Sequence, residues 1–207
     1  MHILCFYPNI VDHFRLIFIS LAFYYFQNPI VFITLYALSY ILDLFDGVVA
    51  RACHQVTAFG QIYDVICDRS CTATMLIMLS HLHPNWKGYF IFIMLFDLFA
   101  HWYIFNSTLL VKESSHKASH GIPILWLYYD VPYMLCTTVV FSEVHQLVCY
   151  YIGMNSAITK NVYFMALFWV SWVIFAFKQL TNVSHILLAL KRFVDLEEDS
   201  KKKTNIT

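Results

Sequence analysis

Four aspartates and an arginine lie between residues 43 and 68, next to segments that are apolar enough to sit in lipid. On insertion scales an Asp or Arg at the centre of a membrane helix costs roughly 2.5–3.5 kcal/mol. Four carboxylates together therefore need compensating partners, and divalent cations are the obvious ones. A chain with this feature must fold so that its acidic side chains share positive charge.

The spacing of the aspartates indicates a shared site. Asp43 and Asp46 are three residues apart and Asp64 and Asp68 are four apart, so each pair occupies one face of its helix. Two such helices facing each other would form a cage of four carboxylates. Two divalent ions would neutralise this cage and could bridge a pyrophosphate, because Mg²⁺ and Mn²⁺ prefer hard oxygen ligands. Two-metal sites clamp the attacking and leaving oxygens of phosphoryl displacement, so the sequence predicts phosphoryl transfer.

Small residues and an arginine accompany the aspartates. Gly47 and Ala50 follow Asp43 along its helix, and Gly60 precedes Asp64 by one turn, which leaves room for a ligand. Arg51 would meet that ligand at the water boundary, with a forked donor suited to phosphate.

Composition favours a helical membrane protein. Of the 207 residues 60% are hydrophobic and 13% charged, and the mean hydropathy is +0.62. Thirteen basic and thirteen acidic residues balance, so no basic field indicates nucleic acid as a partner. The six cysteines have no CxxC spacing and are interpreted as small buried hydrophobes.

The predicted fold is all-α, a polytopic bundle of six transmembrane helices. The expected spans are residues 10–27, 30–52, 60–82, 89–110, 133–154 and 162–190. Residues 1–190 are predicted to be one transmembrane domain and residues 191–207 a charged, disordered cytosolic tail. Lys and Arg gather on the side that holds both termini, so this side is expected to be cytosolic, as is the site. Arg15, near the start of the first span, is expected to snorkel to a headgroup, with a role in the site as the alternative.

The eight residues Asp43, Asp46, Gly47, Ala50, Arg51, Gly60, Asp64 and Asp68 form the pattern DxxDGxxARx8GxxxDxxxD. The chain thereby resembles the CDP-alcohol phosphatidyltransferases, whose signature has every one of these gaps. Eight fixed positions match by chance at about 10^-10 per start, so coincidence does not explain the match.

The resemblance implies a set of roles and partners. CDP-diacylglycerol would donate its phosphatidyl group to an alcohol, with CMP leaving. Asp43, Asp46, Asp64 and Asp68 would hold two Mg²⁺ or Mn²⁺ ions, and Asp68 would also be the general base. Gly47, Arg51 and Thr57 would contact the CDP moiety. It further implies a homodimer, and for a multi-pass enzyme of phospholipid synthesis we expect the endoplasmic reticulum membrane.

Within this family the chain is similar to the members that use myo-inositol as the acceptor. The shared stretches are the opening YPN, residues 42–69, the DxxxHW at 97–102 and the SHK at 115–117. Polar residues there are candidates for the acceptor pocket: His101, Asn106, Ser107, Ser115, His116 and Lys117. The chain departs from the pattern after the SHK, where Ile122, Trp126 and the pair Asp130-Val131 replace the usual Asn and Arg residues. Serine, glycerol phosphate or another alcohol therefore stays open as the acceptor.

Other interpretations remain open as well. The aspartates could form a structural ion-pair network, although Arg51 and Arg69 are the basic residues expected nearby. Asp97 and His101, four residues apart, could be a buried pair that fixes the fourth helix rather than part of a pocket. As non-enzymatic alternatives, intramembrane carboxylates also occur in ion and proton transporters, and a catalytically inactive scaffold would keep the fold without turnover.

Overall fold

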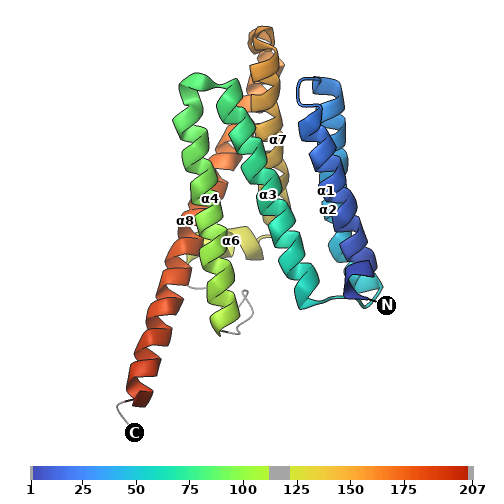
Figure 1. The fold of residues 1–207 in the computed structure, drawn as a ribbon. Coiled ribbons are helices and arrows are strands. Elements are labelled where there is room, and N and C mark those ends of the chain that lie inside the picture. Colours follow the sequence, from blue (N-terminus) through green and yellow to red (C-terminus); the bar gives the residue numbers. More distant parts are fainter. Residues whose placement is uncertain (1, 112–121, 205–207) are drawn as a thin grey trace. The chain divides into compact units, whose positions relative to one another are not determined.

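The computed structural model describes residues 2–111 and 122–204, which form helices and short connections without β-strands (Figure 1). The elements in chain order are η1 (Ile3–Cys5), α1 (Tyr7–Tyr24), α2 (Pro29–Ala52), α3 (Ala58–Leu82), η2 (Pro84–Trp86), α4 (Lys87–Val111), α6 (Pro123–Asp130), α7 (Met134–Met154), η4 (Ser156–Lys160) and α8 (Val162–Thr204). The prediction of an all-α fold is confirmed.

Within the described residues, four helical segments are long and apolar enough to cross a membrane. These are Pro29–Ala52, Pro84–Leu110, Met134–Met154 and Val162–Glu198. The predicted count of six spans is not confirmed, because α1 and α3 do not meet the same standard. Charged side chains lower the hydropathy of both helices, and these charges are the ones that build the site described below.

Residues 2–78 form one compact unit, in which α1 packs along α2 as an antiparallel hairpin (Figure 1). An aromatic cluster closes the connected end of this hairpin. Phe32 is fully buried, and the centroid of its ring lies 5.1 Å from that of Phe26 and 5.6 Å from that of Tyr36. Asn28 caps α2 by accepting a hydrogen bond from the Val31 N–H, and Pro29 begins the helix. Because the helices are antiparallel, the first turns of α1 lie beside the last turns of α2.

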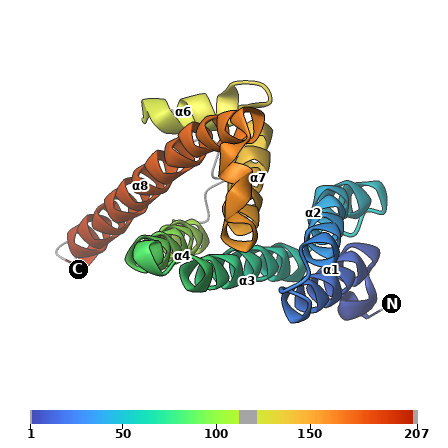
Figure 2. The same ribbon diagram turned by 90° about the horizontal axis from the view of Figure 1, so that it is seen from above.

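Residues 79–204 form the second unit, in which α8 packs against α4 and α7 and α6 lies beside α8 (Figure 2). Buried polar side chains join these helices. Asn182 donates to Asp97 over 3.1 Å, and Arg192 donates to the hydroxyls of Ser107 and Thr108 over 3.3 Å each. The interior of this unit is thus partly polar. These buried polar side chains hydrogen-bond to one another, as buried polar groups in proteins generally do.

The end of α8 differs from the sequence-based prediction. Residues 191–204 continue the helix rather than forming a disordered tail. Glu197 and Glu198 precede Lys201 and Lys202 by four residues each, an orientation that stabilises helices by about 0.2–0.5 kcal/mol per pair. The mixed charge that was interpreted as disorder therefore has helical spacing.

A close approach at Gly153 of α7 gives a test of the second unit. A Cβ there would lie 2.9 Å from the Leu82 Cβ and 3.1 Å from His83 Nε2, whereas one at Gly88 would meet nothing within 4 Å. We expect Gly153→Ala to destabilise the purified protein by about 1–3 kcal/mol through overpacking. Gly88→Ala should leave the melting temperature unchanged or slightly raised. Equal shifts in the two thermal melts would contradict this packing.

Candidate active site

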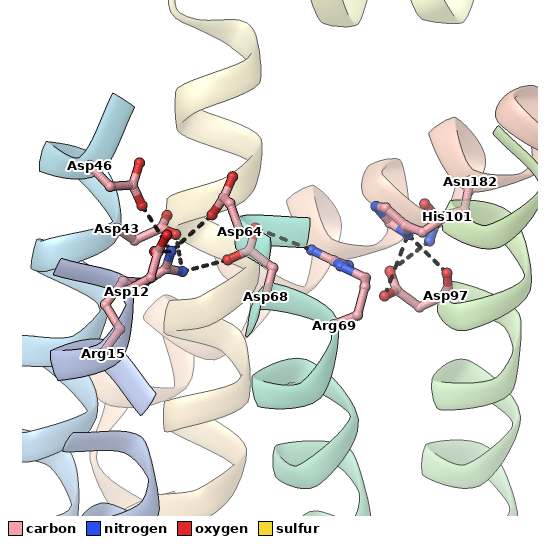
Figure 3. Close-up of polar contacts among 10 residues, drawn as sticks. All are labelled: Asp12, Arg15, Asp43, Asp46, Asp64, Asp68, Arg69, Asp97, His101 and Asn182. Carbon is pink, nitrogen blue, oxygen red and sulfur yellow. Dashed lines mark hydrogen bonds and ion pairs between the residues drawn. The ribbon is translucent and has the colours of Figure 1, made fainter. Parts of the chain in front are cut away.

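A single guanidinium lies at the centre of the acidic cluster, which is built entirely within the first unit (Figure 3). Arg15 of α1 is 4% exposed and ion-pairs with five carboxylates. These come from three helices: Asp12 from α1, Asp43 and Asp46 from α2, and Asp64 and Asp68 from α3. Buried charge thus connects all three helices, and α1 and α2 also pack along each other.

The two terminal nitrogens of Arg15 divide the carboxylates into two groups. One nitrogen, Nη1, lies 2.8 Å from oxygens of Asp12 and Asp46 and 2.9 Å from one of Asp64. The other, Nη2, lies 2.5 Å from an oxygen of Asp68 and also pairs with Asp43. Each nitrogen therefore sits among carboxylate oxygens, as a bound cation would.

Two sets of three carboxylates are close enough to hold a divalent ion. In each set the ligand oxygens lie within 4.8 Å of one another; one set is Asp12, Asp46 and Asp64, and the other is Asp43, Asp64 and Asp68. Asp64 belongs to both sets. Carboxylate oxygens are the donors that Mg²⁺ and Mn²⁺ prefer, so the residues present fit two such ions.

The four aspartates predicted from the sequence are thus brought together, whereas the expectation for Arg15 is wrong. We expected this side chain to snorkel to a headgroup, but it is buried among carboxylates. Asp12 was missed altogether, although it is 2% exposed and pairs with Arg15 three residues along the same helix. An acid and a base at this spacing inside an apolar segment is the signal that could have identified both.

A pocket of about 140 Å³ opens beside the cluster. Its lining combines acidic, small and hydrogen-bonding residues from all three helices and the connection between α2 and α3: Pro8, Asn9, Asp12, Asp46, Gly47, Ala50, Arg51, Gln55, Val56, Thr57, Gly60, Gln61 and Asp64. Gly47, Arg51 and Thr57, the residues expected to contact CDP, are all among them. Their role as CDP ligands stays a prediction, but they share one pocket with two of the predicted metal ligands.

The connection between α2 and α3 explains how this pocket is shaped. His54 adopts φ 53°, a left-handed conformation that ends α2. Gln55 then accepts a hydrogen bond of 2.8 Å from the Tyr7 N–H, which ties the connection to the start of α1. The Thr57 hydroxyl accepts from the Gly60 N–H over 3.0 Å, in the manner of an N-cap, and begins α3.

Glycine at position 47 permits a close approach across the pocket. A Cβ there would lie 3.3 Å from a terminal nitrogen of Arg51. The absence of a side chain lets the exposed Arg51 guanidinium lie over the last turn of α2, where it faces the pocket.

The structure describes only some of the residues expected to form the acceptor pocket, and their role stays a prediction. His101, in α4 of the second unit, has Nδ1 2.8 Å from the Asp97 carbonyl oxygen and 3.6 Å from a carboxylate oxygen of Asp97. Asp97 also accepts from Asn182 of α8, which fits the alternative that this pair fixes the helix (Figure 3). Ser115, His116 and Lys117 lie outside the described residues.

A second polar group lies nearby in the same unit. The Tyr129 hydroxyl is 3.0 Å from His185 Nε2, and burial raises the pKa of Tyr129, so this hydroxyl keeps its proton. No residue spacing predicts this pair, because the whole of α7 separates α6 from α8 along the chain.

Comparison with known proteins identifies the family. A family model described as CDP-alcohol phosphatidyltransferase matches residues 5–195. The chain belongs to this family. With four helices apolar enough to cross a membrane, it is an integral membrane member of it.

Similar curated proteins come from several eukaryotes and carry one name. The CDP-diacylglycerol–inositol 3-phosphatidyltransferase of Homo sapiens is 30% identical over 98% of this chain and 98% of that protein. The protein of that name from Saccharomyces cerevisiae is 29% identical over 100% of this chain and 94% of its own. The CDP-diacylglycerol–inositol 3-phosphatidyltransferase 1 of Arabidopsis thaliana is 33% identical over 72% of this chain and 67% of that protein. No solved structure gives a significant match.

The central position of Arg15 predicts a stability change that depends on metal. Removing one partner from a buried ion pair costs about 3–5 kcal/mol, and each kcal/mol shifts the melting temperature of a chain this size by about 2–4 °C. We expect Arg15→Gln to lower the melting temperature in EDTA by roughly 10 °C, and Mn²⁺ to recover much of that loss.

The matched control is Arg51→Gln, which removes an exposed guanidinium from the same unit. It should leave the melt in EDTA nearly unchanged. If the two variants melt alike, or if Mn²⁺ stabilises Arg15→Gln less than the parent protein, the guanidinium does not have the place in the cluster described above.

Proposed function

We propose that this protein transfers the phosphatidyl group of CDP-diacylglycerol to myo-inositol, giving phosphatidylinositol and CMP. The observation that carries the proposal is the sharing of one pocket by Arg51 and the carboxylates Asp46 and Asp64, which belong to two sets able to hold divalent ions. The names of the full-length relatives supply the acceptor. The names of the relatives do not say which residues of this chain act, and the acidic cluster does not say which alcohol accepts the phosphatidyl group.

The acidic cluster is suited to a pyrophosphate only when cations accompany it. Divalent ions held by the two sets of carboxylates would bind pyrophosphate oxygens and make CMP a better leaving group. The carboxylates themselves orient those ions, and the fixed ends of α2 and α3 hold the carboxylates. Because Arg15 already pairs with carboxylates of all three helices, we infer that these carboxylates are positioned before substrate binds.

Arg51, Gly47 and Thr57 would hold the nucleotide. Arg51 offers a planar fork that can bind two phosphate oxygens at once. Gly47 leaves space beneath that guanidinium, since a Cβ would approach it to 3.3 Å. Thr57 accepts the Gly60 N–H, so its own O–H remains available to donate into the pocket.

Asp68 would act as the general base. Its side chain is 34% exposed and that of Asp64 is 40% exposed, against 19% for Asp43 and 13% for Asp46, so the two α3 carboxylates form the more open part of the cluster. The acceptor hydroxyl oxygen would attack the phosphorus that carries the diacylglycerol, while its proton passes to the Asp68 carboxylate. The bond from that phosphorus to the oxygen of CMP would break, and CMP would leave with the electron pair.

The acceptor would be bound by polar side chains outside the signature. We keep His101, Ser115, His116 and Lys117 as the proposed inositol contacts, because a polyol needs several donors and acceptors. Serine or glycerol phosphate is the alternative acceptor, favoured by the absence of the usual Asn and Arg residues around Ile122, Trp126 and Asp130.

We further propose the membrane arrangement expected from the sequence. Residues 1–190 would act as one transmembrane domain with six spans, α1 and α3 crossing the membrane beside the four apolar helices. Both termini and the acidic cluster would face the cytosol, in the endoplasmic reticulum, and the enzyme would be a homodimer. The distribution of Lys and Arg supports the orientation.

The role of Asp68 can be separated from substrate binding. We expect Asp68→Asn to bind CDP-diacylglycerol within about threefold of the parent protein and to lose at least about 10²-fold in CMP release, the lower range for general-base catalysis. Asp195→Asn, at an exposed position of α8, is the matched control and should turn over normally. CMP release at the parental rate by Asp68→Asn would remove this residue as the base.

The acceptor is tested by supplying one alcohol at a time. Purified protein given labelled CDP-diacylglycerol and Mn²⁺ or Mg²⁺ should release CMP with myo-inositol, and EDTA should stop it. Release with serine or glycerol phosphate instead would keep the chemistry and overturn the acceptor. No release with any alcohol would favour the transporter or scaffold interpretation.

A further inference from the structure

The family signature accounts for four carboxylates, but the cluster contains five. Asp12 of α1 lies outside the signature, is 2% exposed and reaches the same Arg15 nitrogen as Asp46 and Asp64. We propose that Asp12 is a direct ligand of the divalent cation held by Asp46 and Asp64. The inference rests on the proposed function, because it adds a ligand to the metal site assumed there.

The geometry of the three carboxylates supports this assignment. Their oxygens lie within 4.8 Å of one another, so a small movement would bring all three within ligand distance of one hard cation. They come from three helices, so the ion would connect α1, α2 and α3. Asp12 is the most buried of them, so leaving it without a positive partner would be the most costly.

An unpartnered oxygen beside these carboxylates points independently to a ligand. Asn9, one turn before Asp12, is 1% exposed and lines the same pocket. Its Nδ2 donates to the Ile3 carbonyl over 2.7 Å, which fixes the amide with Oδ1 turned the other way. Oδ1 has no hydrogen-bond partner, and it lies 3.1 Å from the position a Cβ would take at Gly60 of α3, another residue of the pocket lining.

A buried amide oxygen without a partner costs about 1–3 kcal/mol, so native proteins rarely keep one unless something else satisfies it. Asn side-chain oxygens are ligands of hard cations and acceptors for the waters that Mg²⁺ retains. An ion at Asp12, Asp46 and Asp64, with its waters, would supply the missing partner for Asn9. A role for Asp12 confined to its ion pair with Arg15 would leave this oxygen unexplained.

Charge supplies a further argument. Five carboxylates and one guanidinium give the cluster four net negative charges, counting the five aspartates minus Arg15. Two divalent cations would neutralise this number. Without Asp12 the buried cluster with Arg15 would carry one excess positive charge when both ions are bound. Asp12 therefore balances the charge of Arg15 in the loaded site.

The test measures metal binding by the full-length purified protein without substrates, using Mn²⁺ detected by electron paramagnetic resonance. Asp12→Asn should weaken Mn²⁺ binding at one of two sites by at least about tenfold, the loss that groups supporting metal ligands already reach. Asp97→Asn, which changes a buried carboxylate of the second unit, is the control and should bind like the parent. Unchanged Mn²⁺ affinity in Asp12→Asn would overturn the proposal.

A second variant keeps the test decisive if Asp12→Asn fails to fold. Asp12→Cys replaces a hard ligand by a soft one, so Cd²⁺ should stabilise this variant in thermal melts more than it stabilises the parent, and Mn²⁺ less. An Asp12 that only pairs with Arg15 predicts no change in that metal preference. If Asp64→Asn loses Mn²⁺ binding while Asp12→Asn binds Mn²⁺ as the parent does, Asp12 is not a ligand and the proposed function stands. A parent protein that binds no Mn²⁺ would reject both.

Discussion

The ion pairs of Arg15 are the interaction on which the first unit depends. Carboxylates drawn from three helices would repel one another at these separations, and in a medium of low dielectric that repulsion is large. One planar guanidinium with two terminal nitrogens relieves it at two points. The cluster can therefore exist as a formed site, since its geometry does not wait for ions or for substrate.

Much of this site could be predicted from the sequence, for a reason that is specific to helices. The spacings between Asp43 and Asp46 and between Asp64 and Asp68 determine which face each pair occupies, and a four-carboxylate motif in apolar helices leaves few alternatives. Gly47, Arg51 and Thr57 came from the resemblance to the family, and their role in binding CDP stays a prediction. Their meeting in one pocket depends on the turn at His54, which the motif spans but does not describe.

Asp12 and Arg15 could not be predicted in the same way. A lone arginine near the start of an apolar segment usually reaches a headgroup, and the sequence does not say which helix α1 will pack against. The antiparallel pairing with α2, closed by Phe26 and Phe32, decides that Arg15 faces the aspartates. In the second unit the same limit applies to Asp97 and Asn182, whose contact depends on how α4 meets α8. At the end of α8 the composition indicates disorder, but the spacing of Glu and Lys favours the helix that the structure has there.

Asp64 belongs to both sets of carboxylates, and Arg15 contacts both sets with one rigid group. Occupancy of the two positions by ions would therefore be thermodynamically linked. The first ion would have to rearrange the contacts that Arg15 makes with both sets while Arg15 stays in the cluster, and the second would find them already rearranged. Repulsion between the ions across Asp64 opposes this, so the sign of the cooperativity reports which of the two effects is larger.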